Sequence, residues 1–333
     1  MVTFLSGGTG TPKLLWGADS IFPPRDSVVI ANTGDDVVLG DLHVSPDIDT
    51  LLFAGAGLLD RTKWWGIDSD PTTTTDFLAT LTHRAGISSE PAYLSDEEQV
   101  TGRPLSKWRR FARVPEFMTI GDRDRAHHMV RTQLLEDGES LTSVTNALAD
   151  IYDLKRTIFP MTNDPVATLI HTPDGVIHFQ EYWVARQACP AVKAVEFRGA
   201  ESAQPTEVVN DALDSPVVIG PANPVTSLGP MIAMEWFDKA LRQTPTVMVS
   251  PFIEKEVFSG PAAQLMEGLG YEASTAGVAA MLPHVDHFVL DSADSTVLDR
   301  PTSQTDTRIE SVEDARRVAR ACHEAVNGLI EDV

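Results

Sequence analysis

Short apolar runs that alternate with helical patterns are the main feature of this chain. Each run is apolar at consecutive positions, which is typical of strands covered on both faces of a parallel sheet. Five such runs cover residues 2–5, 27–31, 217–219, 246–249 and 287–290. The alternation predicts an α/β fold, a doubly wound and mostly parallel Rossmann-like sheet, with its ligand-binding loops at the carboxyl ends of the strands.

Other segments depart from this pattern. Residues 166–172 and 176–184 flank the turn Pro173-Asp174-Gly175 and predict an antiparallel hairpin. Residues 311–330 predict a final helix, capped by Ser311.

Residues 62–120 also depart from the pattern. They mix acids, prolines and threonines with the basic run Lys107-Trp108-Arg109-Arg110. We expect a largely helical excursion there, with residues 107–110 in an exposed loop. The whole chain, 1–333, is then one Rossmann-like domain with an excursion over 62–120 and a β-hairpin insert over 160–200.

The first strand leads into a glycine-rich loop and a helical pattern. Glycines let the backbone turn with its N–H groups toward a ligand, and strand–loop–helix units of this kind bind phosphate. The loop lacks the third glycine of the dinucleotide fingerprint and the spacer of the P-loop, so a plain tight turn is the alternative. The residues expected to bind phosphate are Gly7, Gly8, Thr9, Gly10, Thr11 and Lys13.

Carboxylates are concentrated after the second strand. The chain's 29 Asp in 333 residues would place only one or two in a window of 15, whereas residues 35–49 hold five. Carboxylate oxygens are the ligands that Mg²⁺ prefers, so a phosphate loop beside this cluster favours a phosphorylated ligand held with a divalent metal. A solvated acidic loop is the alternative. The five residues are Asp35, Asp36, Asp41, Asp47 and Asp49.

Residues 121–128, Gly-Asp-Arg-Asp-Arg-Ala-His-His, lie at the start of another helical pattern. Asp122 there can cap the helix, and Arg123 offers a planar fork to a phosphate or carboxylate. A salt-bridged cap is the alternative. Neighbouring helical side chains point about 100° apart, so we do not expect His127 and His128 to hold one metal ion.

Two later loops add polar groups. Met161-Thr162-Asn163-Asp164-Pro165 is ordinary turn chemistry. Residues 220–227, Gly-Pro-Ala-Asn-Pro-Val-Thr-Ser, directly follow a strand and form a stiff loop that can present backbone N–H groups, Asn223 and Ser227 to a nucleotide. Several such loops at strand ends indicate one shared crevice.

The charge balance is strongly acidic. The formal net charge is −22, with 7 Lys and 19 Arg, and the acids are spread along the whole length. Such a surface repels nucleic acid and anionic membranes, and it suits a cytosol of high salt. The two cysteines lie outside any CxxC motif, and no apolar run approaches the about 20 residues of a membrane span. We therefore expect a cytoplasmic, salt-adapted protein without nucleic-acid or membrane partners.

Taken together, the motifs resemble the 2-phospho-L-lactate transferases of coenzyme F420 biosynthesis, and with the acidic composition they point to a halophilic archaeon. The longer segment Ser88–Glu116 departs from the family pattern. The match runs in family order from residue 3 to about residue 280, and the segments that carry it are 6–15, 32–36, 45–50, 64–67, 121–126, 163–165, 178–181 and 220–230.

The resemblance implies a Mg²⁺-dependent transferase of a substituted phosphate group. The donor is lactyl- or enolpyruvyl-2-diphospho-5′-guanosine, and the acceptor is the deazaflavin 7,8-didemethyl-8-hydroxy-5-deazariboflavin (Fo), for which the excursion at 62–120 lies near the site. The products are coenzyme F420-0 or its dehydro form and GMP. The choice of donor acid and the oligomeric state, a homodimer included, are left open.

The resemblance also implies residue roles. Asp35 and Asp47 bind Mg²⁺, Asp49 holds or deprotonates the attacking hydroxyl, and Arg123 positions the deazaflavin or the transferring group, which makes Asp35, Asp49 and Arg123 the catalytic set. The glycine loop and Lys13 cradle phosphate, and residues 220–227 hold the guanosine end. The remaining substrate-binding candidates are Thr11, Asp122, Asp164, Gly220, Asn223 and Ser227.

Two rival functions are weaker. A non-enzymatic sugar-nucleotide-binding regulator of the same superfamily has no need for the acid motif at 45–50 or for the motif at 121–125. An NAD-dependent oxidoreductase would carry an acid at the end of the second strand, where this chain has Asn32.

Overall fold

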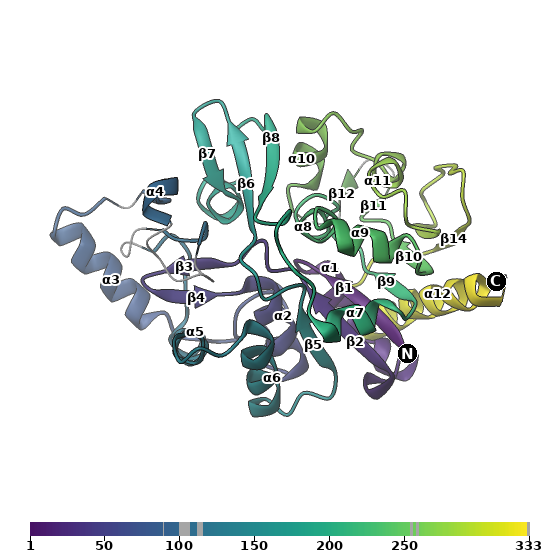
Figure 1. Cartoon of the computed structure of the whole chain (residues 1–333), viewed down its shortest axis with the longest axis horizontal. Coiled ribbons are helices and arrows are strands. Elements are labelled where there is room, and N and C mark those ends of the chain that lie inside the picture. Colours follow the sequence, from purple (N-terminus) through teal and green to yellow (C-terminus); the bar gives the residue numbers. More distant parts are fainter. Residues whose placement is uncertain (89, 100–106, 112–115, 254–255, 258–259, 332–333) are drawn as a thin grey trace.

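Seven parallel strands form the central sheet, in the order β14-β13-β10-β9-β1-β2-β5 (Figure 1). The computed structural model describes residues 1–88, 90–99, 107–111, 116–253, 256–257 and 260–331. The sheet confirms the predicted fold class and its five apolar strands. The strands are β1 (Val2–Ser6), β2 (Ser27–Ala31), β5 (Thr157–Pro160), β9 (Val217–Ile219), β10 (Thr246–Val249), β13 (His287–Asp291) and β14 (Thr302–Thr305).

Both faces of the sheet are covered, because alternate residues of the apolar strands enter different apolar clusters. In β10, Val247 and Val249 belong to one cluster and Met248 to the other. The first face is covered by α1 (Gly10–Leu15), α2 (Pro46–Gly55), α6 (Leu141–Ile151) and α12 (Val312–Glu331). The second is covered by α7 (Glu207–Leu213), α8 (Gly229–Ile232), α9 (Glu235–Leu241), α10 (Ala262–Gly268) and α11 (Thr275–Met281).

The strand order reverses between β1 and β9. From β1 the chain fills positions toward β5, and later it fills the other side from β9 to β14. The loops after β1 and β9 therefore diverge to opposite sides and leave a crevice at the carboxyl ends of these strands.

The helix after the first loop is held from the far end of the chain. α1 packs against α12, and Gly17 lies so close to α12 that a Cβ added there would be 2.3 Å from the Val312 carbonyl oxygen.

A second, antiparallel sheet of order β7-β6-β8 stands beside the first. It consists of β6 (Ala167–Thr172), β7 (Gly175–His178) and β8 (Ala194–Arg198). The predicted hairpin is confirmed at β6 and β7, but its second strand ends at His178 rather than at residue 184. There the His178 ring accepts a hydrogen bond from Gln180 N at 3.1 Å, and a π-helical turn, η4 (Glu181–Ala185), follows.

The excursion projects from one end of the molecule, where Figure 1 shows α3 and α4. Of the described residues in 62–120, only α3 (Thr73–Arg84) and α4 (Asp96–Gln99) are α-helical, so the segment is less helical than predicted. Residues 107–110 are not an exposed loop, because the Arg109 side chain is fully buried.

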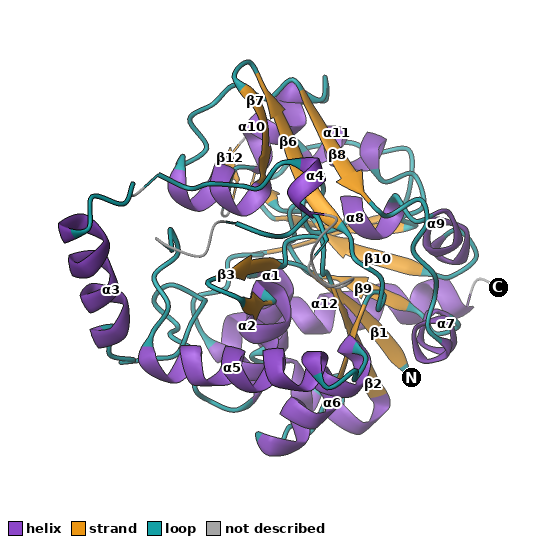
Figure 2. Ribbon diagram, turned by 60° about the vertical axis from the view of Figure 1, so that its left-hand side comes forward, coloured by secondary structure: helices purple, strands orange, loops and turns teal. Residues whose placement is uncertain are grey.

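The hairpin β3 (Val37–Leu39) and β4 (Leu42–Val44) follows β2, and α5 (Asp122–Glu136) packs on β4 (Figure 2). No helix in the described part of the chain is long and apolar enough to cross a membrane. The remaining short elements are β11 (Phe252–Ile253), β12 (Glu256–Val257), η1 (Ala18–Ser20) and η2 (Pro24–Asp26).

Candidate functional site

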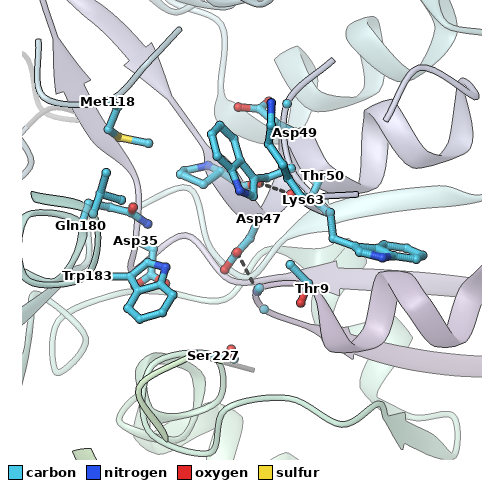
Figure 3. A pocket seen from close by; sticks show the side chains of 18 of the residues that line it. Thr9, Asp35, Asp47, Asp49, Thr50, Lys63, Met118, Gln180, Trp183 and Ser227 are labelled. Atoms are coloured by element: carbon cyan, nitrogen blue, oxygen red, sulfur yellow. Dashed lines mark hydrogen bonds between the residues drawn. The ribbon is translucent and has the colours of Figure 1, made fainter. Parts of the chain in front are cut away.

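A cavity of about 400 Å³ opens at the carboxyl end of β1 (Figure 3). Its walls come from the loops after β1 and β9, the start of α2, residues 62–66, residues 118–120 and the segment at η4. The sequence-predicted site residues that line it are Gly7, Gly8, Thr9, Gly10, Lys13, Asp35, Asp47, Asp49, Asn223 and Ser227.

The glycine loop fits tightly against the loop after β9. A Cβ at Gly7 would lie 2.4 Å from Ser227 Cβ, and one at Gly10 would lie 2.2 Å from the Pro221 carbonyl oxygen. Gly8 has a φ of 62°, which side chains disfavour. Gly7 and Gly10 therefore allow the two loops to approach closely, Gly8 supplies the positive φ of the turn, and the cavity lies beside that approach.

Lys13 faces the cavity from α1. Its ammonium lies 5.5 Å from the centre of the Trp64 ring, and burial lowers its pKa from the ordinary value. A lysine in this position can offer a positive charge to an anionic group in the cavity.

Asp35 and Asp47 are buried carboxylates that form no ion pair with the described residues, although the charge of Asp35 acts on Arg109. Asp47 Oδ1 accepts a hydrogen bond from Gly8 N at 2.7 Å, and its Oδ2 accepts one from Asn32 at 2.9 Å. Burial raises the pKa of Asp47 to about 7, although these hydrogen bonds oppose the rise. Burial, followed by the charge of Asp47, raises the pKa of Asp35 well above its ordinary range.

The environment of this pair fits a divalent cation. Asp35 Oδ1 is buried and has no hydrogen-bond partner. A cation would supply the missing partner and remove the repulsion between the two carboxylates. The donors are hard oxygens, which suits Mg²⁺, Mn²⁺ or Ca²⁺ better than a soft metal.

The two other buried carboxylates of this region are each paired with a buried arginine. Asp36 lies 3.3 Å from Arg109, and Asp49 accepts from both terminal nitrogens of Arg131, at 3.0 Å for Oδ2 and Nη1. Burial would raise the pKa of Asp49, but Arg131 and then His127 outweigh it and hold that pKa well below the ordinary range. Asp49 therefore stays ionised.

His127 and His128 both face Asp49, which the sequence analysis did not expect. His127 Nε2 lies 2.9 Å from Asp49 Oδ1, and His128 Nδ1 lies 3.7 Å from Oδ2. The two rings and the Asp49 carboxylate bring ligand atoms within 4.8 Å of one another, so the 100° spacing does not by itself keep the two histidines from one metal ion. The Arg131 guanidinium, however, occupies the Asp49 oxygens and would compete with a metal there.

Five of the predicted residues lie outside the cavity lining. Arg123 bonds to Asp70 at 3.3 Å and to the Asp68 carbonyl, and Asp122 accepts from Thr74 N at 3.0 Å. Asp164 accepts from Gln204 N at 2.7 Å, across 40 positions of the chain. Their predicted substrate contacts stay predictions.

The other two residues, Thr11 and Gly220, join the two loops to each other. The Thr11 hydroxyl donates to the Leu5 carbonyl at 2.7 Å and accepts from Gly220 N at 3.2 Å. The pair therefore holds the loop after β9 against the start of α1, beside the cavity.

Several lining residues were missed by sequence reasoning. Asp124 and His128 lie one helical turn apart on α5, with His128 Nε2 3.0 Å from an Asp124 oxygen. Trp65 and Trp183 also line the cavity and expose 49% and 42% of their surface. Trp65 and Asp124 belong to segments that carried the family resemblance. The motifs could therefore have indicated these two site residues, whereas periodicity and spacing could not.

Known proteins resemble this chain over its whole length. It is 57% identical to a curated 2-phospho-L-lactate transferase of Haloarcula marismortui, over 98% of this chain and 99% of the relative. The corresponding protein of Halobacterium salinarum is 55% identical, over 98% of each chain. That of Methanosarcina acetivorans is 37% identical, over 99% of each. The first two relatives come from halophilic archaea, in agreement with the acidic composition.

The fold has a solved counterpart as well. A crystal structure of a UPF0052 family member from Bacillus halodurans superposes with a TM-score of 0.59 at 15% identity, over 96% of this chain and 97% of that one. Residues 2–326 match the family model described as 2-phospho-L-lactate transferase CofD. The chain therefore belongs to the 2-phospho-L-lactate transferase CofD family.

Proposed function

We propose that this chain is a 2-phospho-L-lactate transferase. It transfers the phospholactyl or phosphoenolpyruvyl group from a guanosine-diphosphate-linked donor to the deazaflavin Fo in the cytoplasm, and it releases GMP. One observation carries the proposal: a single cavity joins a glycine loop, two unpaired buried carboxylates and exposed aromatic side chains. The glycine loop suits a diphosphate, the two carboxylates suit a divalent cation, and the aromatic side chains suit a flat aromatic acceptor.

Asp35 and Asp47 are the residues that would hold Mg²⁺. When bound, the cation neutralises charge on the diphosphate and on the phosphoryl group that is transferred. The hydrogen bonds from Gly8 N and Asn32 fix the Asp47 carboxylate, so little reorganisation is needed on binding. Asp47 is thus held in place before a cation binds.

The donor lies along the crevice between the loops after β1 and β9. Lys13 and the backbone of residues 7–10 face the diphosphate, while Asn223 and Ser227 line the side that receives the guanosine end. The Asn223 side-chain oxygen Oδ1 already accepts from Val225 N at 2.9 Å, which leaves the side-chain NH₂ group to donate to the nucleotide.

The acceptor lies against the apolar part of the cavity lining. Trp65, Trp183 and Met118 belong to this lining, and their apolar surfaces suit the deazaflavin ring. The attacking hydroxyl then reaches the end of the cavity where Asp49, Asp124 and His128 meet.

Asp49 orients the attacking hydroxyl by accepting its hydrogen bond. Because Arg131 keeps Asp49 ionised, this carboxylate is a weak base and does not keep the proton. Arg123 acts without touching the substrate. Asp70 accepts hydrogen bonds from the Arg123 guanidinium and from the backbone N–H of Asp124, and these two bonds fix the start of α5 beside the cavity.

The test combines purified protein, Fo, the guanosine-diphosphate donor and Mg²⁺ in multimolar KCl, with products read by mass spectrometry. We expect a phospholactyl-Fo product and GMP, both abolished by EDTA. Asp47→Asn should lose activity at limiting Mg²⁺, whereas Asp41→Asn, at an exposed carboxylate of the same segment, should keep it. Tight nucleotide binding without any product would favour a sugar-nucleotide-binding regulator instead.

A further inference from the structure

We propose that Arg109 and Asp36 form a positioning pair that sets the separation of Asp35 and Asp47, the carboxylates assigned above to the cation. The inference rests on the proposed function and deepens it. It gives a role to a buried arginine from the 88–116 segment, which the sequence analysis placed in an exposed loop.

Arg109 joins three parts of the chain. Its Nε donates to the Val166 carbonyl at 2.9 Å, and its Nη2 donates to the Thr33 carbonyl at 2.8 Å. Its Nη1 lies 3.3 Å from Asp36 Oδ2. The guanidinium fork thus fixes the loop after β2, on which Asp35 lies, against the entry to β6.

Asp36 carries this constraint to Asp47. Its Oδ2 also accepts from the Ser45 hydroxyl at 3.0 Å and lies 3.1 Å from His43 Nε2. Ser45 is the N-cap residue of α2, two positions before Asp47. Asp36 is therefore bonded to Asp35 through the backbone and to the start of α2 through its side chain, and a shift of Asp36 moves both cation ligands relative to each other.

The charges support the same assignment. Four carboxylates of residues 35–49 are buried, Asp35, Asp36, Asp47 and Asp49, and two of them have a buried guanidinium partner. The two that remain carry the charge that one divalent cation neutralises. Without Arg109, the carboxylate of Asp36 would have no positive charge beside it. It would then repel Asp35 and Asp47 instead of holding them in position.

The backbone around Arg109 holds it in this position. Val38 N donates to the Arg109 carbonyl at 2.8 Å, and Phe111 N donates to the Val38 carbonyl at 3.2 Å. The next residue, Arg110, points elsewhere and donates to the Glu98 carbonyl at 2.9 Å. Arg110 is therefore a matched control of the same residue type, one position away.

The experiment measures Mn²⁺ binding to the full chain without substrates, by electron paramagnetic resonance in high KCl. Arg109→Gln should weaken Mn²⁺ binding roughly 10- to 100-fold, the usual effect of losing a group that orients a metal ligand. Arg110→Gln should bind as the unmodified protein does. In turnover, Arg109→Gln should raise the Mg²⁺ concentration needed for half-maximal rate more than it lowers the rate at saturating Mg²⁺.

A folded Arg109→Gln protein with unchanged Mn²⁺ affinity would overturn the positioning role. If that variant does not fold, Asp36→Asn takes its place. It keeps the side-chain volume but removes the negative charge beside Arg109, so it should also weaken Mn²⁺ binding. Unchanged Mn²⁺ affinity in Asp36→Asn would overturn the inference.

The proposed function fails separately. Arg109-dependent Mn²⁺ binding without transferase product would refute the function and leave the positioning pair standing. No Mn²⁺ binding to the unmodified protein would refute the cation site and the pair together.

Discussion

The backbone N–H of Gly8 donates a hydrogen bond to Asp47 Oδ1 over 2.7 Å. The donor belongs to the glycine loop after β1, and the acceptor lies at the start of α2, 39 positions later. This contact joins the segment proposed for phosphate to the one proposed for the cation. A change in the loop is therefore expected to affect both ligands.

Gly10→Ala tests the fit of that loop. The added Cβ would meet the Pro221 carbonyl at 2.2 Å, and such overpacking costs about 1–3 kcal/mol of unfolding free energy. We expect weaker donor binding together with a lower melting temperature. Gly328→Ala in α12, where nothing lies within 4 Å of the new Cβ, should instead stabilise by roughly 0.5–1 kcal/mol. Equal donor affinity in both variants would contradict the tight approach of the two loops.

The raised pKa of Asp47 predicts a pH dependence of stability in metal-free protein. Between the ordinary Asp pKa of 3.8 and about 7, the folded state binds more protons than the unfolded state. The unfolding free energy therefore falls as pH rises through this window, and the loss is complete above about pH 7.

Asp47→Asn removes that loss. At about pH 8 without metal, the melting temperature of the variant should lie about 2–4 °C above that of the unmodified protein. This shift corresponds to a gain of roughly 1 kcal/mol in unfolding free energy for a chain of a few hundred residues. Added Mg²⁺ should stabilise the unmodified protein more than the variant. A thermal-unfolding series with EDTA or Mg²⁺ measures this, and identical pH profiles for the two proteins would contradict it.

Arg131→Met should destabilise the fold strongly. Asp49 and Arg131 are both buried, and removal of one partner of a buried ion pair costs about 3–5 kcal/mol. The double variant Arg131→Met with Asp49→Leu leaves no unpaired charge and should recover much of the stability. Chemical denaturation in high KCl reads both. A single variant as stable as the unmodified protein would show that Asp49 does not depend on Arg131.

Salt should control the stability of the whole chain. With a net charge of −22, self-repulsion is strong at low ionic strength and is screened within about 3 Å at 1 M salt. We expect the far-ultraviolet circular dichroism signal to fall on dialysis to low KCl and to return when KCl is restored. A spectrum indifferent to salt would remove the argument for salt adaptation.

The sequence predicted those parts of the fold that depend on local chemistry. The five apolar strands were found because their consecutive apolar residues are buried on both faces of the sheet. The final helix was found from its capping start, where Ser311 and Asp314 bond to each other. β14 (Thr302–Thr305) was missed because Thr-Ser-Gln-Thr has no apolar residue and lies at the sheet edge, where burial demands none.

The glycines and carboxylates of the site could be predicted, because both are locally more frequent than the average composition. The ion-pair and hydrogen-bond partners of the site residues could not be predicted. Nothing near Arg109 in sequence shows that its guanidinium reaches Asp36, 73 positions earlier. Likewise, the helical spacing of His127 and His128 argued against one shared metal ion, and nothing in the sequence shows that both rings face Asp49, at 2.9 and 3.7 Å.

The packing of α1 on α12 has a consequence for the order of folding during synthesis. β1 and its loop leave the ribosome long before the segments that support them, because one edge of β1 waits for Val217–Ile219 and α1 waits for the helix that begins at Val312. A nascent chain that stops short of Val217 would thus hold a glycine loop without its second wall. The binding crevice therefore cannot form as the glycine loop emerges, and α1 gains its support only after α12 has been synthesised.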